Sequence, residues 1–203
     1  MRNDLYYYTI DKIAFAEFKD KGSRFIAYAY PITKADDFKK YLQVLKKEHP
    51  KAVHHCFAYQ LGLDGNTFRV NDDGEPGGTA GRPILSVINS NNLTNILIIV
   101  VRYFGGTLLG APGLINAYKS ASAMALQVIP FVQKSVEICY ELQFDYTKMN
   151  DVMMVLKQYL CSIIMQDNQL FCIVQTGIPK ARLDEVLAKL KDLHTVVVKK
   201  LVI

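Results

Sequence analysis

The first part of the chain contains short runs in which apolar and polar residues alternate. Three of these runs, at 6–10, 14–18 and 24–30, are rich in aromatic and β-branched residues, which is typical of β-strands. Residues 54–61 and 67–70 repeat the pattern on either side of an Asp-Gly-Asn turn. That arrangement predicts a β-hairpin.

Apolar residues at helical spacing predict three helices in the same part of the chain. The first has an apolar stripe between Phe38 and Leu45, with Thr33 as the expected N-cap and Pro50 at its end. The nearly continuous β-branched run before the third helix predicts a strand buried on both faces. The elements expected after the hairpin are a helix that has Pro83 in its first turn and ends at about Asn89, a strand at 95–104, and a helix from about Pro112 to Val128.

After Pro130 the pattern becomes a regular alternation of strands and helices. The expected elements are strands at about 134–144, 161–166, 170–176 and 195–202, and helices at 147–159 and 180–191. This order is the ferredoxin-like pattern, with Asp167-Asn168 as the turn of the middle hairpin. We therefore predict an α+β protein: residues 1–131 form an N-terminal two-layer α/β sandwich, and residues 132–203 form a ferredoxin-like βαββαβ domain.

The composition is that of a folded protein. Half of the 203 residues are apolar and 21% are charged, which suits sizeable cores and argues against disorder. The net charge of +5 is compatible with nucleic acid without requiring it. The four cysteines form no Cys-x-x-Cys pair, and the N-terminus lacks the apolar stretch of a signal peptide. We expect reduced thiols, a cytoplasmic location and no membrane span.

Two glycine-rich segments, residues 71–83 and 100–118, lead directly into helical sequence. Glycine permits positive φ and a close approach of the backbone to a partner, and a helix start presents N–H groups that suit an anion. These loops indicate a binding surface built from backbone rather than a catalytic triad. The loop residues expected at this surface are Gly78, Thr79, Gly105, Gly106, Thr107 and Gly110.

Asp72, Asp73 and Glu75 lie within four positions of the first loop. Their oxygens could hold magnesium or calcium, or two of the carboxylates could share general acid–base work. Alternatively the loop is a structural turn whose acids pair with Arg82 or Arg102, or accept from the N–H groups of the next helix start. We favour the structural alternative, because a metal needs about six convergent oxygens, and we expect neither a metal nor a cofactor.

His54, His55 and Cys56 follow one another on a predicted strand. Neighbouring residues of a strand point to opposite faces, so the two histidines are poorly placed to share an ion, and the triplet is a weak zinc signal. His54 and Cys56 would share a face, which leaves a weak base–nucleophile pair open. The pattern does not show which histidine faces a site.

Arg102, Tyr103 and Phe104 end the buried strand, where ligands gather in open α/β sheets. Arg102 carries a planar fork suited to phosphate, and Tyr103 or Phe104 could stack on a base. An equally open alternative places one ring in the core and Arg102 in an internal salt bridge with the acidic loop. In either case we expect the acids, both arginines and the Gly105-Gly106 turn to line one concave surface.

Residues 72–84 and 102–118 resemble the two signatures of the IMPACT family in its bacterial YigZ branch, and residues 54–59 resemble a third block. The resemblance implies an N-terminal domain like those of several ribosomal and translation-factor proteins, and a ferredoxin-like domain similar to one in elongation factor G. It also implies a link to translation control. Gly77 stands where a serine is usual in the family, which weakens a hydrolase role.

We therefore predict a non-enzymatic RNA- or ribosome-associated protein linked to the regulation of translation. In this hypothesis the glycine-rich loops and Arg102 bind phosphate, and the partner could also be a protein of the translation machinery. One alternative is a protein–protein interaction module. A second alternative is a metal-dependent hydrolase with His54, Asp72, Asp73 and Glu75 around an ion.

Overall fold

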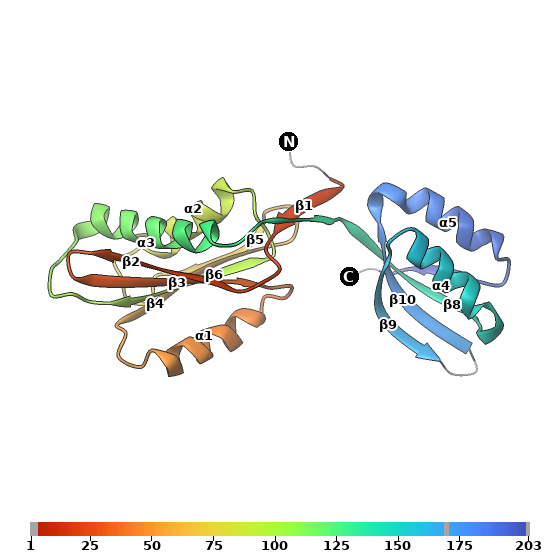
Figure 1. Cartoon of the computed structure of the whole chain (residues 1–203), viewed down its shortest axis with the longest axis horizontal. Helices are drawn as coiled ribbons and strands as arrows, with labels where there is room; N and C mark the ends of the chain where they lie inside the picture. Colours follow the sequence, from red (N-terminus) through yellow and green to blue (C-terminus); the bar gives the residue numbers. More distant parts are fainter. Residues whose placement is uncertain (1–3, 169–170, 202–203) are drawn as a thin grey trace. The chain divides into compact units, whose positions relative to one another are not determined.

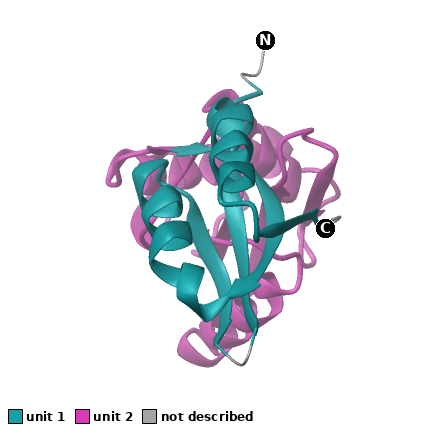
Figure 2. Ribbon diagram, turned by 90° about the vertical axis from the view of Figure 1, so that its right-hand side faces the viewer, with its two compact units in different colours: residues 1–6, 134–203 teal, residues 7–133 magenta. Residues whose placement is uncertain are grey.

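The computed structural model describes residues 4–168 and 171–201 and divides into two compact units. Residues 7–133 form one unit, and residues 134–203 form the other together with residues 1–6 (Figure 2). The sequence-based boundary between 131 and 132 lies close to this division, although it assigned the first residues to the N-terminal domain. Each unit combines sheet and helices, and the predicted α+β class is confirmed.

The N-terminal unit is built on a five-stranded antiparallel sheet with the strand order β2-β3-β6-β4-β5 (Figure 1). Helices α2 and α3 cover one face and α1 covers part of the other. The expected two-layer sandwich is thus extended by a third layer. The elements are β2 (Ala14–Asp20), β3 (Ser23–Pro31), α1 (Asp37–Glu48), β4 (His54–Leu61), β5 (Thr67–Asn71), α2 (Gly81–Ser90), β6 (Ile96–Tyr103) and α3 (Gly110–Gln127).

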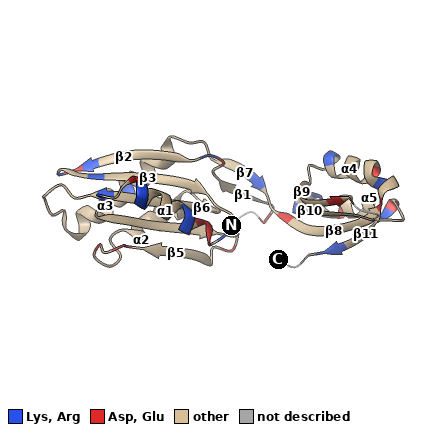
Figure 3. Ribbon diagram, turned by 90° about the horizontal axis from the view of Figure 1, so that it is seen from below, with Lys and Arg blue, Asp and Glu red and all other residues tan. Residues whose placement is uncertain are grey.

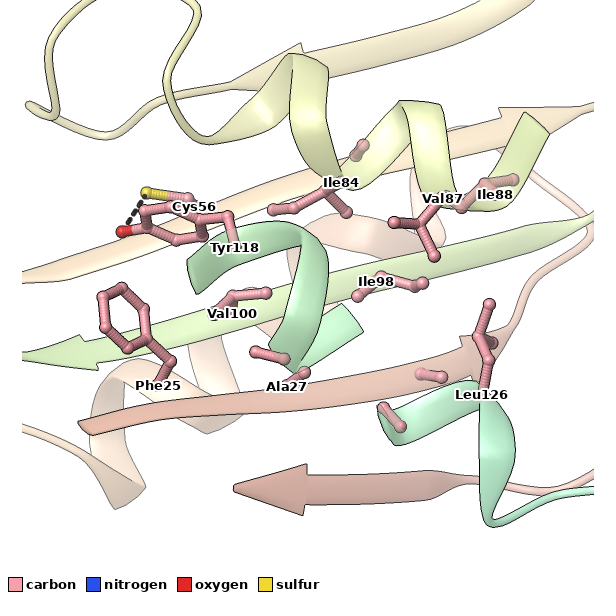
Figure 4. Close-up of a cluster of buried hydrophobic side chains, with 14 of the residues drawn as sticks. Phe25, Ala27, Cys56, Ile84, Val87, Ile88, Ile98, Val100, Tyr118 and Leu126 are labelled. Atoms are coloured by element: carbon pink, nitrogen blue, oxygen red, sulfur yellow. Dashed lines mark hydrogen bonds between the residues drawn. The ribbon is translucent and has the colours of Figure 1, made fainter. Parts of the chain in front are cut away.

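The central strand β6 holds the two cores of this unit together. Its residues from Ile96 to Val101 are fully buried, as the continuous apolar run predicts. Ile98 and Val100 face the core under α2 and α3 (Figure 4), whereas Ile99 and Val101 face the core under α1. Each buried aliphatic side chain contributes about 1.5–3 kcal/mol to the stability of the fold. The strand therefore holds Arg102 and Tyr103, at its C-terminal end, in fixed positions.

The starts of the three helices of this unit agree with the sequence to different degrees. Thr33 does not cap α1; instead its N–H donates to the Asp37 carboxylate at 3.1 Å, and the helix begins at Asp37. Helix α2 begins at Gly81, which places Pro83 in its first turn as predicted, and α3 begins at Gly110, two residues before Pro112. A proline remains compatible with these positions because N–H groups of the first turn have no intrahelical partner.

Near the boundary of the two units, β1 (Tyr6–Thr9) pairs with β7 (Val132–Ser135) in a two-stranded sheet. The single strand predicted at 134–144 is therefore divided into β7 and β8 (Glu137–Asp145). Between them the N–H of Val136 donates to the carbonyl oxygen of Leu5 at 2.8 Å. This bond lies within the C-terminal unit, to which both Leu5 and Val136 belong.

The C-terminal unit has the sheet order β11-β8-β10-β9, all antiparallel, which is the ferredoxin-like arrangement predicted. The predicted turn at Asp167-Asn168 is wrong, because both residues pair with β10, and the connection falls at 169–170, outside the described residues. The elements are β8, α4 (Met149–Gln158), β9 (Ser162–Asn168), β10 (Phe171–Pro179), α5 (Leu183–Asp192) and β11 (Val197–Lys200).

Candidate functional site

Asp72 organises the first glycine-rich loop by binding the start of α2. Its carboxylate accepts hydrogen bonds from the N–H groups of Gly78 at 2.9 Å, Ala80 at 3.0 Å and Gly81 at 2.8 Å. Gly78 reaches this position with φ of +79°, a conformation that glycine adopts without steric cost. The prediction that an acid of this loop binds helix-start N–H groups is confirmed.

The charge on Asp72 is favoured by this arrangement. Burial alone would raise the pKa of the carboxyl group, but the three N–H donors and the charge of Arg82 together lower it below its ordinary value. A lowered folded-state pKa means that the stabilisation is complete above the ordinary value of about 3.9 and is lost as pH falls below it. Asp72 therefore stabilises the loop at neutral pH and ceases to do so in acid.

Replacing Asp72 with asparagine should lower the free energy of unfolding at pH 7 by about 2 kcal/mol, because hydrogen bonds to a charged acceptor are lost. The difference between wild type and Asp72→Asn should shrink as pH falls below about 4 and through the lowered folded-state pKa of the wild-type carboxyl. Urea unfolding at pH 7 and at a pH below about 4 measures this difference in the free energy of unfolding. An equal difference at the two pH values would contradict the assigned role.

Asp73 connects the same loop to the start of β4. It has φ of +41° and is followed by Gly74 at +89°, so the chain makes a tight left-handed turn here. Its carboxylate accepts from the N–H of His55 at 2.7 Å, and its carbonyl oxygen lies 2.8 Å from Nδ1 of His54. Since a carbonyl can only accept, Nδ1 of His54 carries the proton, which leaves Nε2 toward the site.

Glu75 is the centre of a buried polar cluster. Its side chain is only 3% exposed, and its Oε1 lies 2.6 Å from Nη1 of Arg102 and 2.7 Å from the hydroxyl of Tyr118. Nε2 of His54 lies 3.8 Å from the same oxygen. The acid of one loop, the end of β6 and the helix α3 therefore meet at a single carboxylate oxygen.

Arg102 is held inside the protein rather than presented as a free phosphate fork. The residue is 5% exposed, and its guanidinium lies over the rings of Phe25 at 5.3 Å and Phe104 at 5.7 Å. Nη2 is 3.5 Å from the hydroxyl of Ser23. The internal salt bridge with the acidic loop, one of the two alternatives in the sequence, is what the structure contains. Among its polar atoms Nε has no hydrogen-bond partner.

A cavity of about 370 Å³ opens beside this cluster. Its walls come from His54, Glu75, Arg102 and Phe104 and from the start of α3, residues 108–111. The first turn of α3 has no acidic residue, and its N-cap, Leu109, makes no side-chain cap bond. One wall of the cavity is thus a helix N-terminus without the carboxylate that α2 receives from Asp72.

The structure separates the other residues expected on this surface. Tyr103 lies on the opposite face of the sheet, where its hydroxyl bonds to His49. The prediction that Tyr103 belongs to this site is therefore wrong. Thr79 is buried and donates to the carbonyl of Pro76, which makes it part of the turn. The expected residues that do not line the cavity, all of them described, are Asp72, Asp73, Gly78, Thr79, Arg82, Tyr103, Gly105, Gly106 and Thr107. The single concave surface expected from the sequence is therefore reduced to the four side chains above and Gly110.

Tyr118, Phe25 and Ser23 belong to the cluster but were missed in the sequence. A signal existed for Tyr118, because a tyrosine in the apolar stripe of a buried helix needs a hydrogen-bond partner for its hydroxyl. Phe25 and Ser23 carried no such signal, since their contacts come from residues more than 70 positions away.

Cys56 also lies in this cluster, on the same face as His54. Its sulfur is 3.0 Å from the carbonyl oxygen of Asp72 and 3.3 Å from the hydroxyl of Tyr118 (Figure 4). Burial raises the pKa of the Cys56 thiol well above its ordinary value, so the group is a protonated thiol at neutral pH and a poor nucleophile. The base–nucleophile pair left open in the sequence has no support from this geometry.

Within residues 4–168 and 171–201, no three His, Cys, Asp or Glu side chains converge in a group that could hold a metal ion. None of the helices that the structure describes has the length and apolar character needed to cross a membrane.

Fold and site together define a two-domain α+β protein in which two glycine-rich loops surround a buried Glu–Arg–Tyr cluster and a cavity. The Impact N-terminal domain matches residues 21–126. IMPACT family member YigZ from Escherichia coli (strain K12) is 36% identical over 174 residues, which are 85% of each chain. The chain belongs to the IMPACT family, in its YigZ branch.

Two further comparisons agree with this assignment. IMPACT family member YvyE from Bacillus subtilis (strain 168) is 36% identical over 141 residues, 70% of this chain and 65% of that protein. A solved structure described as "Crystal structure of an hypothetical protein" covers 98% of both chains with a TM-score of 0.77 and 31% identity. The likeness therefore extends over both units.

Proposed function

We propose that this chain is a non-enzymatic, cytoplasmic binding protein that associates with RNA or the ribosome and takes part in the regulation of translation. The family resemblance implies the link to translation. The observation that carries the RNA assignment is the uncapped start of α3 in the wall of the cavity. A helix N-terminus of this kind favours an anion through its free N–H groups and its dipole.

The two glycine-rich loops have different roles in this proposal. The start of α2 already holds the carboxylate of Asp72, so it has no room for a phosphate. The start of α3 has no such acid, and Gly110, with φ of +69°, brings its backbone to the cavity. An RNA phosphate would therefore bind at α3, and the first loop would act as its structural support.

The side chains of the cavity suit the rest of a nucleotide. Phe104 is 48% exposed at the cavity and offers a ring on which a base can stack. In the neutral tautomer that donates from Nδ1 to Asp73, Nε2 of His54 can accept a hydrogen bond from a ribose hydroxyl. Arg102 contributes less than the sequence indicated, because Glu75 neutralises most of its charge.

Introducing an acid beside α3 tests the phosphate site. Leu108 is 84% exposed, so Leu108→Asp should fold normally and even gain about 0.5 kcal/mol from the helix dipole. The same charge should repel a phosphate and weaken binding of single-stranded RNA about tenfold. Fluorescence anisotropy with a labelled oligonucleotide of about 12 nucleotides measures the affinity, and thermal unfolding measures the stability.

Leu160→Asp is the matched control, because Leu160 is 83% exposed and lies in the other unit. It adds the same charge far along the chain and should leave the RNA affinity unchanged. The logarithm of the RNA affinity should also fall linearly with the logarithm of the salt concentration, by roughly 0.7 per phosphate contacted. Equal losses in the two variants would show that only the net charge matters and would contradict a site at α3.

A protein partner is the second candidate, and a specific observation favours it. Val53, Phe104 and Leu108 line the cavity and are 56%, 48% and 84% exposed. Apolar side chains gathered at an opening are a feature of protein-binding surfaces. Binding to the translation machinery that ignores salt and survives ribonuclease treatment would favour this candidate over RNA.

A further inference from the structure

A second surface with binding character lies on the opposite face of the N-terminal sheet. Helix α1 covers only part of this face, and beyond it Phe15 of β2 is 66% exposed. One side of the Phe15 ring stacks on Tyr28 of β3, with ring centroids 5.9 Å apart and planes inclined by 28°. The ring therefore lies at the edge of the sheet with Tyr28 on one side and much of its remaining surface in solvent.

Charged residues alternate with the aromatic rings on this face. The register places Lys19, Arg24 and Tyr103 side by side across β2, β3 and β6. The guanidinium of Arg24 lies over the Tyr103 ring, 5.3 Å from its centroid. The side chains of Lys19 and Arg24 are 70% and 47% exposed, and the two cations share the single carboxylate of Glu17, which leaves one positive charge in excess.

Hydrogen bonds hold the two tyrosines of this surface in place. His49, at the end of α1, lies between them: Nε2 is 2.8 Å from the hydroxyl of Tyr28, and Nδ1 is 2.9 Å from that of Tyr103. Using both ring nitrogens fixes the imidazole and both phenol rings against the sheet. A rigid aromatic surface loses little conformational entropy when a ligand stacks on it.

The charge around these rings is mainly positive. Exposed lysines at 46, 47 and 51 flank His49 in sequence, and Figure 3 shows Lys and Arg on α1 and at the end of β2. The acids nearby are Glu17, which pairs with both Lys19 and Arg24, Asp20 at the end of β2, Glu48, and Asp73, whose carboxylate lies 3.9 Å from Nζ of Lys46. Cations next to stacked rings complement a partner that carries both phosphates and flat bases.

We infer that this surface, formed by Phe15, Lys19, Arg24, Tyr28 and Tyr103, stacks the bases of single-stranded RNA. The inference rests on the proposed RNA association and adds a second contact on the face opposite the α3 cavity. Phe15 receives a base on its open side, and Arg24 and Lys19 bind the adjoining phosphates. Single strands are specified because only unpaired bases expose their faces to an aromatic side chain.

The absence of tryptophan from the chain allows a direct test. Phe15→Trp introduces a single tryptophan at the proposed surface, whose fluorescence can be excited selectively at wavelengths that the tyrosines absorb little, and Phe68→Trp introduces one at a matched position. Phe68 is 52% exposed, on β5 at the other edge of the sheet and on its opposite face. Titration with a single-stranded oligouridylate of about 12 nucleotides should quench the first variant saturably and leave the second unchanged.

Affinity measurements complete the test. Phe15→Ala should weaken oligouridylate binding by about 5- to 150-fold, the loss expected for one base stack, whereas Phe68→Ala should stay within twofold of wild type. Because both rings are exposed, we expect both alanine variants to fold, and thermal unfolding checks this. If Phe15→Ala binds as wild type while Leu108→Asp does not, this inference is overturned and the proposed function stands. If the wild-type protein binds no oligouridylate, both are overturned.

Discussion

Replacing Glu75 with alanine should lower the free energy of unfolding by about 3–5 kcal/mol. Arg102 is 5% exposed, and Glu75 is the one carboxylate that forms an ion pair with it in the described structure. Removing the acid leaves a buried positive charge without compensation, and the hydroxyl of Tyr118 loses its acceptor as well. Urea unfolding followed by circular dichroism measures the change.

An exposed ion pair in the same unit provides the matched comparison. Arg24 and Glu17 approach to 2.7 Å, close to the 2.6 Å between Arg102 and Glu75, but their side chains are 47% and 33% exposed. Glu17→Ala should therefore cost less than about 1 kcal/mol, because water screens and replaces the interaction. Similar losses in the two variants would show that burial does not control the energy of the Glu75 pair.

The double variant Glu75→Leu with Arg102→Met separates the value of the pair from the cost of breaking it. Removing both charges removes the uncompensated ion, and apolar side chains of similar volume can fill the space. The double variant should recover most of the stability lost in Glu75→Ala. A double variant as unstable as the single one would mean that the cluster depends on hydrogen bonds that neither apolar side chain can replace.

Replacing Gly105 with alanine should lower the free energy of unfolding by about 3 kcal/mol or more. A Cβ at this position would overlap the backbone of Gly22 and Ser23 in the turn between β2 and β3. Backbone atoms on both sides cannot move as a side chain would, so the turn must separate from the end of β6. The bond from the N–H of Gly105 to the hydroxyl of Ser23 would be lost with it.

Two other glycine substitutions control for effects other than the overlap. A Cβ on Gly106 meets open space, but its φ of +86° is unfavourable for alanine, which costs about 1 kcal/mol. A Cβ on Gly77 meets nothing and its φ is ordinary, so Gly77→Ala should stay within about 0.5 kcal/mol of wild type. Thermal unfolding should show the largest loss of stability for Gly105→Ala, a smaller loss for Gly106→Ala and the smallest for Gly77→Ala. A small loss of stability in Gly105→Ala would contradict the close approach of Gly105 to the turn.

Much of the fold follows from local patterns in the chain. The burial of β6 on both faces is predicted by its continuous apolar run, and the strand–helix order after Pro130 predicts the ferredoxin-like unit. Part of the site is predicted in the same way. Asp72 lies only nine positions before Gly81, so its bond to the helix start is a short-range consequence of the loop.

The rest of the site could not be predicted because its residues come from distant positions. Alternation along β4 and β6 predicts that His54 and His55, or Tyr103 and Phe104, point in opposite directions. It does not say which direction leads to the cavity, since that depends on which helices cover which face. The sequence likewise does not predict the difference between the two helix starts, because it depends on where both helices begin: the start of α2 is bound by Asp72, whereas the start of α3 lacks an acid.

Short-range physics in the chain therefore specifies the helices, the strands, the two-unit organisation and the capping of α2. The partners of Arg102 depend on the tertiary fold: it brings Glu75, Ser23 and Phe25 around one guanidinium from 27 to 79 positions away. It also leaves the α3 start and the Phe15 surface open to solvent. From the sequence, Arg102 suits phosphate. In the fold it is buried and pairs with Glu75 instead, because a guanidinium removed from water must be paired inside the protein.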